Sequence, residues 1–496
     1  MGPVWLGRNS QFSKIRMGQL ESVGRRIVAA IKERIHGGAY RPGDRLPSSR
    51  AFAAEWGASR TTVTAAYGQL IAEGYLISRQ GARPVVARGL AAPPGAAPES
   101  MPPARALSGF AQRLLALPAP APRESFPVAD FRYGDLAGAD FPVLAWRRAL
   151  AKVALRRPAR LRYGDPQGDP ALRAALQGYL WRARGIACSA DDILVVNGSQ
   201  QGLDLCARLL LDPGDRFLME NPGYALARHA FLAAGGEAVP VPVDPDGLLT
   251  DALPPARLVY VTPSHQYPLG GVLSAPRRRA LLAWAASVDG YVVEDDYDGE
   301  YRHDVAPIPP LQTLNPQAVI YAGTVSKTLS PTLRLGYLVL PAALRQAFVE
   351  AKRLTDRHAP LLEQEALAEV LASGAYERHV RSIRRRNAER RSVLLAALAE
   401  SCGQAITVEG AETGLHLVVW LDGVPAARES AIAEAARAAG IGLYPVSPLY
   451  DASVPRPETA GFVLGYAALE GDALRRGVAI LAAILTQERR TAGTRP

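Results

Sequence analysis

The sequence predicts a multidomain protein in which an N-terminal winged helix-turn-helix of the α+β class precedes an α/β domain that ends in a small α+β lobe. Three observations predict this class. The first ninety residues carry helix and strand patterns at the spacing of a winged helix. An Ala- and Pro-rich stretch follows, and strand-like runs then alternate with helical runs over roughly 350 residues.

The composition is that of a globular protein with a sizeable core, since 48% of the 496 residues are hydrophobic and 21% are charged. This excludes a fibrous or largely disordered chain. The sequence has no run of about 20 apolar residues and no secretory signal pattern at its start, so we expect a cytoplasmic protein without a membrane span. Its three cysteines are too scattered for a disulfide framework or a metal knuckle, and we expect reduced thiols.

The positive charge is concentrated at the N-terminus. Residues 1–90 hold 14 Lys and Arg against 5 Asp and Glu, whereas the net charge of the whole chain is +10. A basic module on a nearly neutral body indicates a polyanion as partner, because neutralised phosphates release counterions. Charge alone leaves both a nucleic acid and an anionic membrane open.

The basic module is predicted in detail. The first helix follows from apolar residues at four-residue spacing, which are Val23, Ile27, Ile31 and Ile35. Ser48 and Ser59 are predicted to cap a second and a third helix. Strands at 75–77 and 85–86 then complete a hairpin. This order of elements is typical of a winged helix-turn-helix.

The second helix of such a motif inserts its N-terminal residues into the major groove of DNA, so we expect the contacts there and on the flanking arginines. The candidate DNA-binding residues are Arg50, Arg60, Thr61, Thr62, Arg79 and Arg83. For any single arginine, a solvated surface is the alternative. The stretch RPGDRLPSSRAFAAEWGASRTTVTAAYGQLIAEGYLISRQG closely resembles the GntR-type winged helix, which implies binding of double-stranded DNA.

The strongest chemical signal of the second domain is AGTVSKTLSPTLRLGY at 322–337. Lys327, just past a strand and among small hydroxyl residues, is placed to form a Schiff base, and Arg334 can bind a phosphate. One ligand, pyridoxal 5'-phosphate, explains both. The alternative for the lysine alone is a surface position.

Other segments supply partners for the same ligand. Asp295, at the carboxyl end of an apolar strand, is expected to hold the pyridine nitrogen, with Tyr297 donating to the phenolic oxygen. A metal site in this acidic stretch is the alternative, but the glycine and final glutamate of a calcium loop are missing. Ser199 and Gln200 open a helix whose backbone amides can bind phosphate. Tyr224 offers a ring to stack on the pyridine.

In this order, the segments resemble the fold-type-I aminotransferase fold over roughly residues 130–485. A GntR-type module joined to such a domain resembles the MocR class of bacterial transcriptional regulators. The resemblance implies cofactor-binding roles for Lys327, Asp295, Tyr297, Tyr224, Ser199, Gln200, Thr324 and Arg334, with Lys327 as the residue that bonds the cofactor. We expect the winged helix at 12–87, an Ala- and Pro-rich linker at 88–125 and the aminotransferase-like domain at 126–490. Its large lobe spans about 130–345 and its small lobe about 346–490. Within the linker, the apolar patch 110–117 is expected to form a docked helical turn.

Two departures from the aminotransferase pattern bear on catalysis. Tyr267 stands where relatives carry an asparagine, and Val463 stands where they carry the arginine that grips the substrate α-carboxylate. Arg228 and Arg456 are the nearest substitutes for that arginine. Loss of the clamp argues against efficient transamination, since orientation of the substrate depends on it.

The sequence thus predicts a DNA-binding transcriptional regulator that senses pyridoxal 5'-phosphate. An amino compound stays open as a second effector. The resemblance implies a homodimer, and no membrane partner is expected. Two alternatives remain: a working aminotransferase with an accessory winged helix, and an aminotransferase-like domain that binds no cofactor and only dimerises.

Overall fold

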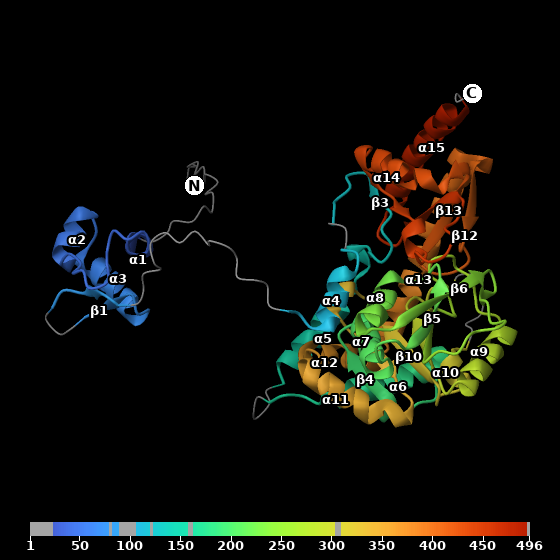
Figure 1. Cartoon of the computed structure of the whole chain (residues 1–496), viewed down its shortest axis with the longest axis horizontal. Helices are drawn as coiled ribbons and strands as arrows, with labels where there is room; N and C mark the ends of the chain where they lie inside the picture. Colours follow the sequence, from blue (N-terminus) through green and yellow to red (C-terminus); the bar gives the residue numbers. More distant parts are fainter. Residues whose placement is uncertain are drawn as a thin grey trace, which may run out of the picture. The chain divides into compact units, whose positions relative to one another are not determined.

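The computed structural model describes residues 23–78, 82–88, 106–119, 123–156, 162–302 and 309–493, with the side chains of the last helix to residue 489 (Figure 1). The chain divides into two compact units, Met1–Ala106 and Leu107–Pro496. No helix in the described ranges is both long and apolar enough to cross a membrane. The three cysteines are free thiols, as predicted.

The N-terminal unit is a winged helix-turn-helix, as predicted. Its elements are α1 (Val23–His36), α2 (Ser49–Glu55), α3 (Arg60–Ala72), β1 (Leu76–Ile77) and β2 (Val85–Val86). β1 and β2 pair antiparallel, with Leu76 opposite Val86. The predicted apolar stripe of α1 packs on α3, except for its first residue, Val23, which is 45% exposed at the start of the helix.

Both predicted caps of this unit are present. The Ser48 hydroxyl accepts a hydrogen bond from the Ala51 amide at 3.2 Å, and the Ser59 hydroxyl accepts one from the Thr62 amide at 3.1 Å. Each cap satisfies an amide that has no partner within its helix, which fixes where α2 and α3 begin. The Tyr67 hydroxyl donates to the Pro47 carbonyl at 2.9 Å and ties α3 to the turn before α2.

The large lobe is built on an eight-stranded mixed sheet with the order β4-β11-β10-β9-β8-β5-β6-β7. Its strands are β4 (Ile193–Val196), β5 (Arg216–Asn221), β6 (Glu237–Asp244), β7 (Gly247–Leu248), β8 (Leu258–Val261), β9 (Tyr291–Asp296), β10 (Val319–Thr324) and β11 (Gly336–Val339). β10, β9, β8, β5 and β6 are successively parallel, while β11 is antiparallel to both β10 and β4. The strand-like runs of the sequence at 193–196, 216–219, 258–261, 291–293, 319–322 and 335–340 are all strands in the structure. The sequence pattern did not predict β6 and β7.

Helices cover both faces of this sheet (Figure 1). One face packs on α7 (Ser199–Leu210), α8 (Ala225–Ala234) and α11 (Arg345–Asp356). The other packs on α5 (Val143–Ala154), α6 (Pro170–Arg184), α9 (Ala275–Ser287), α10 (Leu311–Leu314) and α12 (Leu361–Ala372). Strands buried on both faces read as continuous apolar runs, which is why β4 and β8 were visible in the sequence.

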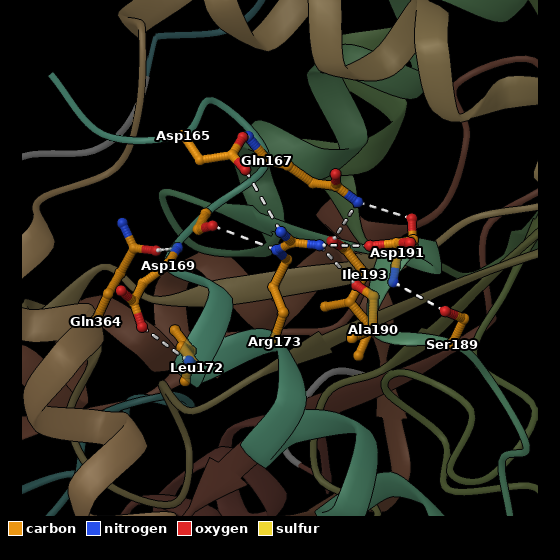
Figure 2. Close-up of polar contacts among 11 residues, drawn as sticks. Asp165, Gln167, Asp169, Leu172, Arg173, Ser189, Ala190, Asp191, Ile193 and Gln364 are labelled. Carbon is orange, nitrogen blue, oxygen red and sulfur yellow. Dashed lines mark hydrogen bonds and ion pairs between the residues drawn. The ribbon is translucent and has the colours of Figure 1, made fainter.

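Arg173 of α6 anchors the loop that precedes this helix to the start of β4 (Figure 2). Its guanidinium donates to the Gly168 and Ala190 carbonyls and pairs with Asp165 at 3.4 Å and Asp191 at 3.1 Å. A buried guanidinium is tolerated because several acceptors surround it. The cluster holds the turn that leads into β4. The position of β4 matters for the site because α7 begins three residues after this strand ends.

The small lobe packs α13 (Ala375–Cys402), α14 (Glu429–Ala438) and α15 (Gly471–Gly493) on a four-stranded sheet of order β12-β13-β16-β15. These strands are β12 (Ile406–Glu409), β13 (His416–Pro425), β15 (Tyr444–Pro445) and β16 (Thr459–Gly465). A separate parallel pair joins β3 (Ala129–Asp130) to β14 (Ile441–Gly442). The sequence pattern favours one helical run over 361–399, but the structure has two helices, because the chain turns at Ser373 and Gly374, where Gly374 has φ +65°.

The predicted helical turn at 110–117 is confirmed as α4 (Gly109–Ala116), which packs against α8. The Arg113 guanidinium donates to the carbonyls of Ala233 at 2.9 Å and Ala234 at 3.2 Å. These are carbonyls of the last turn of α8, which have no partner within the helix. Arg113 therefore caps α8 from outside.

Candidate functional site

The start of α3 presents exposed polar groups on the N-terminal unit. Arg60 and Thr61 are exposed in its first turn, and the Thr62 hydroxyl lies 2.7 Å from the Ser59 hydroxyl. Arg50 on α2 and Arg83 before β2 are also exposed. Arg79 lies outside the described residues. The side chains that the sequence singled out are thus available to a partner at the described positions.

The second candidate site lies in the large lobe, where the carboxyl ends of its parallel strands meet. The last residues of β9 and β10 and the segments that follow β4, β5, β9 and β10 carry the predicted residues. Open α/β sheets bind ligands at this edge because loops and helix N-termini converge there. The sheet thus brings together residues that are as much as 135 positions apart, from Ser199 to Arg334.

Asp295 has one carboxylate oxygen engaged and one without a partner. The Tyr260 hydroxyl donates to Oδ2 at 2.7 Å, while Oδ1 is buried and accepts no hydrogen bond from the described residues. Burial raises the pKa of Asp295 to about 6, although Tyr260 and Lys327 oppose the rise. A buried acceptor without a partner is costly, so this oxygen fits a donor that is not part of the chain.

Lys327 follows β10 and lies close to this carboxylate. Its Nζ lies 4.5 Å from the ring centroid of Tyr133. Burial holds the pKa of the lysine below its usual range, while Asp298, Asp135 and Asp295 oppose the shift. A lowered pKa leaves more of the amine neutral near pH 7, which is the form that attacks a carbonyl.

The N-terminus of α7 and Arg334 form a cradle for an anion. The Arg334 guanidinium donates to the Asn197 carbonyl at 2.8 Å. Gly198 has φ +75°, and a Cβ at this position would lie 2.9 Å from Arg334 Nη2. Glycine is therefore required both by the backbone and by the close approach of the guanidinium. Thr324 adds a hydroxyl that lies 2.9 Å from the Ser326 hydroxyl.

The remaining predicted residues lie around the same edge. Gln200, next to Ser199 in the first turn of α7, donates to the Leu226 carbonyl at 3.1 Å, and its Oε1 is buried without a partner among the described residues. Tyr224 is half-buried at the start of α8, and burial raises its pKa to about 12. The Tyr297 hydroxyl donates to the His265 carbonyl at 2.8 Å.

Three residues of this site escaped the sequence analysis. Tyr133 comes from the segment before α5, Tyr260 from the interior of β8, and His416 from the first position of β13. The Tyr133 ring lies 4.6 Å from the His416 ring and 5.2 Å from the Tyr267 ring, measured between centroids. Single Tyr and His residues outside any motif gave no signal in the sequence.

His265, Asp298 and His416 bring three potential metal-ligand atoms within 4.8 Å of one another. The His265 Nδ1 lies 2.9 Å from an Asp298 oxygen, and the His416 Nε2 lies 3.0 Å from the Pro268 carbonyl oxygen. Burial lowers the pKa of His416 well below its usual value, so this ring is neutral near pH 7. In each of the two histidine rings, one nitrogen therefore lies within hydrogen-bond distance of an oxygen of the chain.

Comparisons with known proteins agree with both domains. The family "Aminotransferase class I and II" matches residues 128–451, and "Bacterial regulatory proteins, gntR family" matches residues 24–86. The chain is 35% identical over 467 residues to the probable rhizopine catabolism regulatory protein MocR of Rhizobium meliloti, which covers 92% of each chain. It is 34% identical to the pyridoxine biosynthesis transcriptional regulator PdxR of Corynebacterium glutamicum, over 81% of this chain and 84% of the relative.

The chain belongs to the MocR-type regulators of the GntR family. Among solved structures, the aminotransferase-like domain of this MocR-type chain is similar to the kynurenine aminotransferase of Pyrococcus horikoshii, solved in complex with PMP. The TM-score is 0.67 at 29% identity, over 73% of this chain and 91% of that one. It is also similar to the α-aminoadipate aminotransferase LysN of Thermus thermophilus, with a TM-score of 0.67 at 27% identity, over 77% of this chain and 96% of that one. The aminotransferase class I and II family depends on pyridoxal 5'-phosphate.

The residues of this MocR-type chain fit that cofactor. The buried oxygen of Asp295 without a partner matches the need of a protonated pyridine nitrogen for an acceptor. The cradle of Arg334 and the α7 N-terminus, into which a Cβ at Gly198 would protrude, matches a phosphate. Lys327 and its lowered pKa match a group that must bond an aldehyde.

Proposed function

We propose that this chain is a DNA-binding transcriptional regulator whose DNA affinity changes when pyridoxal 5'-phosphate binds at Lys327. The unpartnered, buried Oδ1 of Asp295 carries the proposal, because it calls for a donor from a ligand at the centre of the large lobe. When bound, the cofactor supplies an aldehyde that reacts with primary amines and a ring that accepts electrons.

The residues of the chain have separate tasks in this proposal. Lys327 holds the cofactor, Asp295 keeps its pyridine nitrogen protonated, and the Tyr297 hydroxyl turns from the His265 carbonyl to donate to the phenolic oxygen. Tyr224 covers the ring. The phosphate is held by the residues around the α7 N-terminus, namely Ser199, Gln200, Thr324 and Arg334. On the winged helix, Arg60, Thr61 and Thr62 contact base edges or phosphates, and Arg50, Arg79 and Arg83 flank the groove.

Helix α8 supports a coupling between this site and the linker. It begins beside Tyr224, and its last carbonyls accept hydrogen bonds from Arg113 of α4. α4 lies in the sequence between the winged helix and the large lobe. If the ligand binds more tightly when α8 is in one of two positions, it also favours the position of α4 that goes with it. The free energy of DNA binding then shifts by the difference between the ligand's binding free energies for the two positions.

We also propose that the protein acts as a homodimer, so that two winged helices meet a paired operator. Exposed apolar side chains on α4 and at the start of α8 support a second copy as partner; they are Phe110, Leu114, Leu115 and Leu226. Light scattering of the purified full-length chain tests the oligomeric state, and a monomer at micromolar concentration contradicts this part of the proposal.

DNA binding tests the regulator proposal directly. The full-length chain is titrated against a fragment from its own upstream region, with and without pyridoxal 5'-phosphate, and compared with Lys327→Ala. We expect the affinity of the wild type to change with the cofactor, while that of the variant does not. If neither condition gives sequence-selective binding, the regulator proposal is wrong, and amino-group transfer from amino acids to 2-oxoglutarate becomes the activity to measure.

A further inference from the structure

One face of the small-lobe sheet forms an apolar wall behind Tyr133, which lies next to Lys327. Successive residues of a strand point to opposite faces. Along β13 and β16, one set of residues fills the small-lobe core, and it includes Leu417, Val419, Phe462 and Leu464. The other set includes Val418 and Val463, which are paired across the two strands and pack against Tyr133 and Leu269. Val463 is only 2% exposed.

Tyr133 lies between this wall and the lysine. The same tyrosine packs on the valine cluster and has Lys327 Nζ 4.5 Å from its ring centroid. Two further rings border it, since Tyr267 lies 5.2 Å and His416 lies 4.6 Å from Tyr133 between centroids. A molecule bound to Lys327 or its cofactor would therefore meet aromatic rings on this side, and the buried valines lie behind Tyr133.

The charges near the lysine are negative. The groups that act most strongly on the charge of Lys327 are Asp298, Asp135 and Asp295. His416 is neutral near pH 7, because burial lowers its pKa well below the usual value.

The arginines considered as carboxylate anchors lie elsewhere. Arg228 lies 3.7 Å from Asp451, and Arg132 lies 3.6 Å from Asp130 and over the Tyr444 ring at 4.6 Å. Arg456 is exposed on the loop before β16. In the described part of the chain, none of these guanidiniums is placed on the valine wall.

We propose that the amino effector of this site is a primary amine whose α-carbon carries no carboxylate and whose body is apolar or aromatic. The inference rests on the proposed function, since it concerns the ligand of the same site. A carboxylate on the α-carbon would lose its water against aromatic rings and near aspartates, and the guanidiniums of Arg132, Arg228 and Arg456 are not placed to replace that water. An apolar body gains from the same surface, and an ammonium group gains from the aromatic rings as it enters.

A matched pair of ligands tests this proposal. The full-length protein is loaded with pyridoxal 5'-phosphate, and the visible absorbance of the bound cofactor is followed during titration with 2-phenylethylamine or L-phenylalanine, which differ only by the carboxylate. We expect the amine to bind at least tenfold more tightly. Equal or tighter binding of phenylalanine would overturn the proposal, and so would an absorbance that responds to neither ligand.

Two variants sharpen the comparison. Val463→Arg should bring the two affinities together or reverse their order, provided that the variant still takes up the cofactor; the wild-type ratio decides the proposal if it does not. Arg132→Gln should leave the ratio within twofold of the wild type. A selective loss of phenylalanine binding in Arg132→Gln would identify Arg132 as a carboxylate anchor and refute the inference. A wild-type protein that takes up no cofactor would instead contradict the proposed function itself.

Discussion

Replacing Asp295 by asparagine is expected to stabilise the cofactor-free protein near neutral pH. The side chain is 4% exposed, and burial raises its pKa to about 6 from an ordinary 3.8. Because the pKa in the folded state lies above that in the unfolded state, the ionised carboxyl costs folding free energy above pH 6. This cost fades as the pH falls through 6 towards 3.8. A shift of about two pKa units corresponds to roughly 3 kcal/mol.

Thermal unfolding of the cofactor-free, full-length chain measures this effect. The unit that contains Asp295 spans Leu107–Pro496. At about 2.1 cal/mol/K of unfolding entropy per residue, a gain of roughly 3 kcal/mol raises its Tm by about 4 °C. We expect this gain for Asp295→Asn at pH 8 and about half of it at pH 5. A Tm equal to that of the wild type at pH 8, or a gain that does not shrink at pH 5, would refute the reasoning.

The same variant should lose most of the stabilisation that the cofactor gives to the wild type, because an amide is a poor partner for a protonated pyridine nitrogen. Glu220→Gln is the matched control. Glu220 is also buried, with a pKa raised to about 7, but both of its oxygens accept hydrogen bonds from Thr262. The control should keep the cofactor-induced rise in Tm. If Asp295→Asn keeps it as well, Asp295 is not the partner of the ring nitrogen.

Three further variants test the remaining parts of the proposal. Arg60→Ala should weaken operator binding by about 1–3 kcal/mol and relax the base preference at one position, as measured by fluorescence anisotropy on a set of mutated operators; unchanged affinity would remove Arg60 from the interface. Gly198→Ala should displace Arg334 and raise the Kd for pyridoxal 5'-phosphate at least tenfold in an absorbance titration, since its Cβ would lie 2.9 Å from the guanidinium; a Kd within twofold of the wild type would exclude the cradle. Arg113→Gln should leave DNA affinity without cofactor within twofold and at least halve the cofactor-dependent change, with Gln112→Ala on the same helix as control; a full cofactor response would show that α8 and α4 do not carry the signal.

The parts of the fold that follow from local patterns were predictable from the sequence. Helices of the N-terminal unit have apolar stripes and serine caps, and the central strands of the large lobe are continuous apolar runs. β6 was missed because Pro240 and Pro242 break its strand pattern. It tolerates them because it lies near the end of the sheet, next to the two-residue strand β7. The break between α12 and α13 was missed because a single glycine, Gly374, marks it.

The site was predictable only where a residue type is chemically distinctive. Lys327, Asp295 and Arg334 stand out because their chemistry is specific and their motifs have polar neighbours. Tyr260 does not, because its hydroxyl reaches Asp295 from within an apolar strand. Its role appears only when β8 and β9 are placed side by side.

The residues around Val463 and Tyr133 are still harder to predict from the sequence. Val463 reads as one more apolar residue of a buried strand, and Tyr133 lies 194 positions before Lys327 in the sequence. The pairing of β13 with β16 places Val463 next to Val418, and Tyr133 packs against the cluster that contains both. The ligand preference that we infer from the missing arginine depends on these contacts, which the sequence does not show. A valine in place of a guanidinium removes the reason for a carboxylate to bind, but it leaves every contact available to an amine. We therefore expect the substitution to change which ligand the site selects, with Lys327, Asp295 and Arg334 still in place to hold a cofactor.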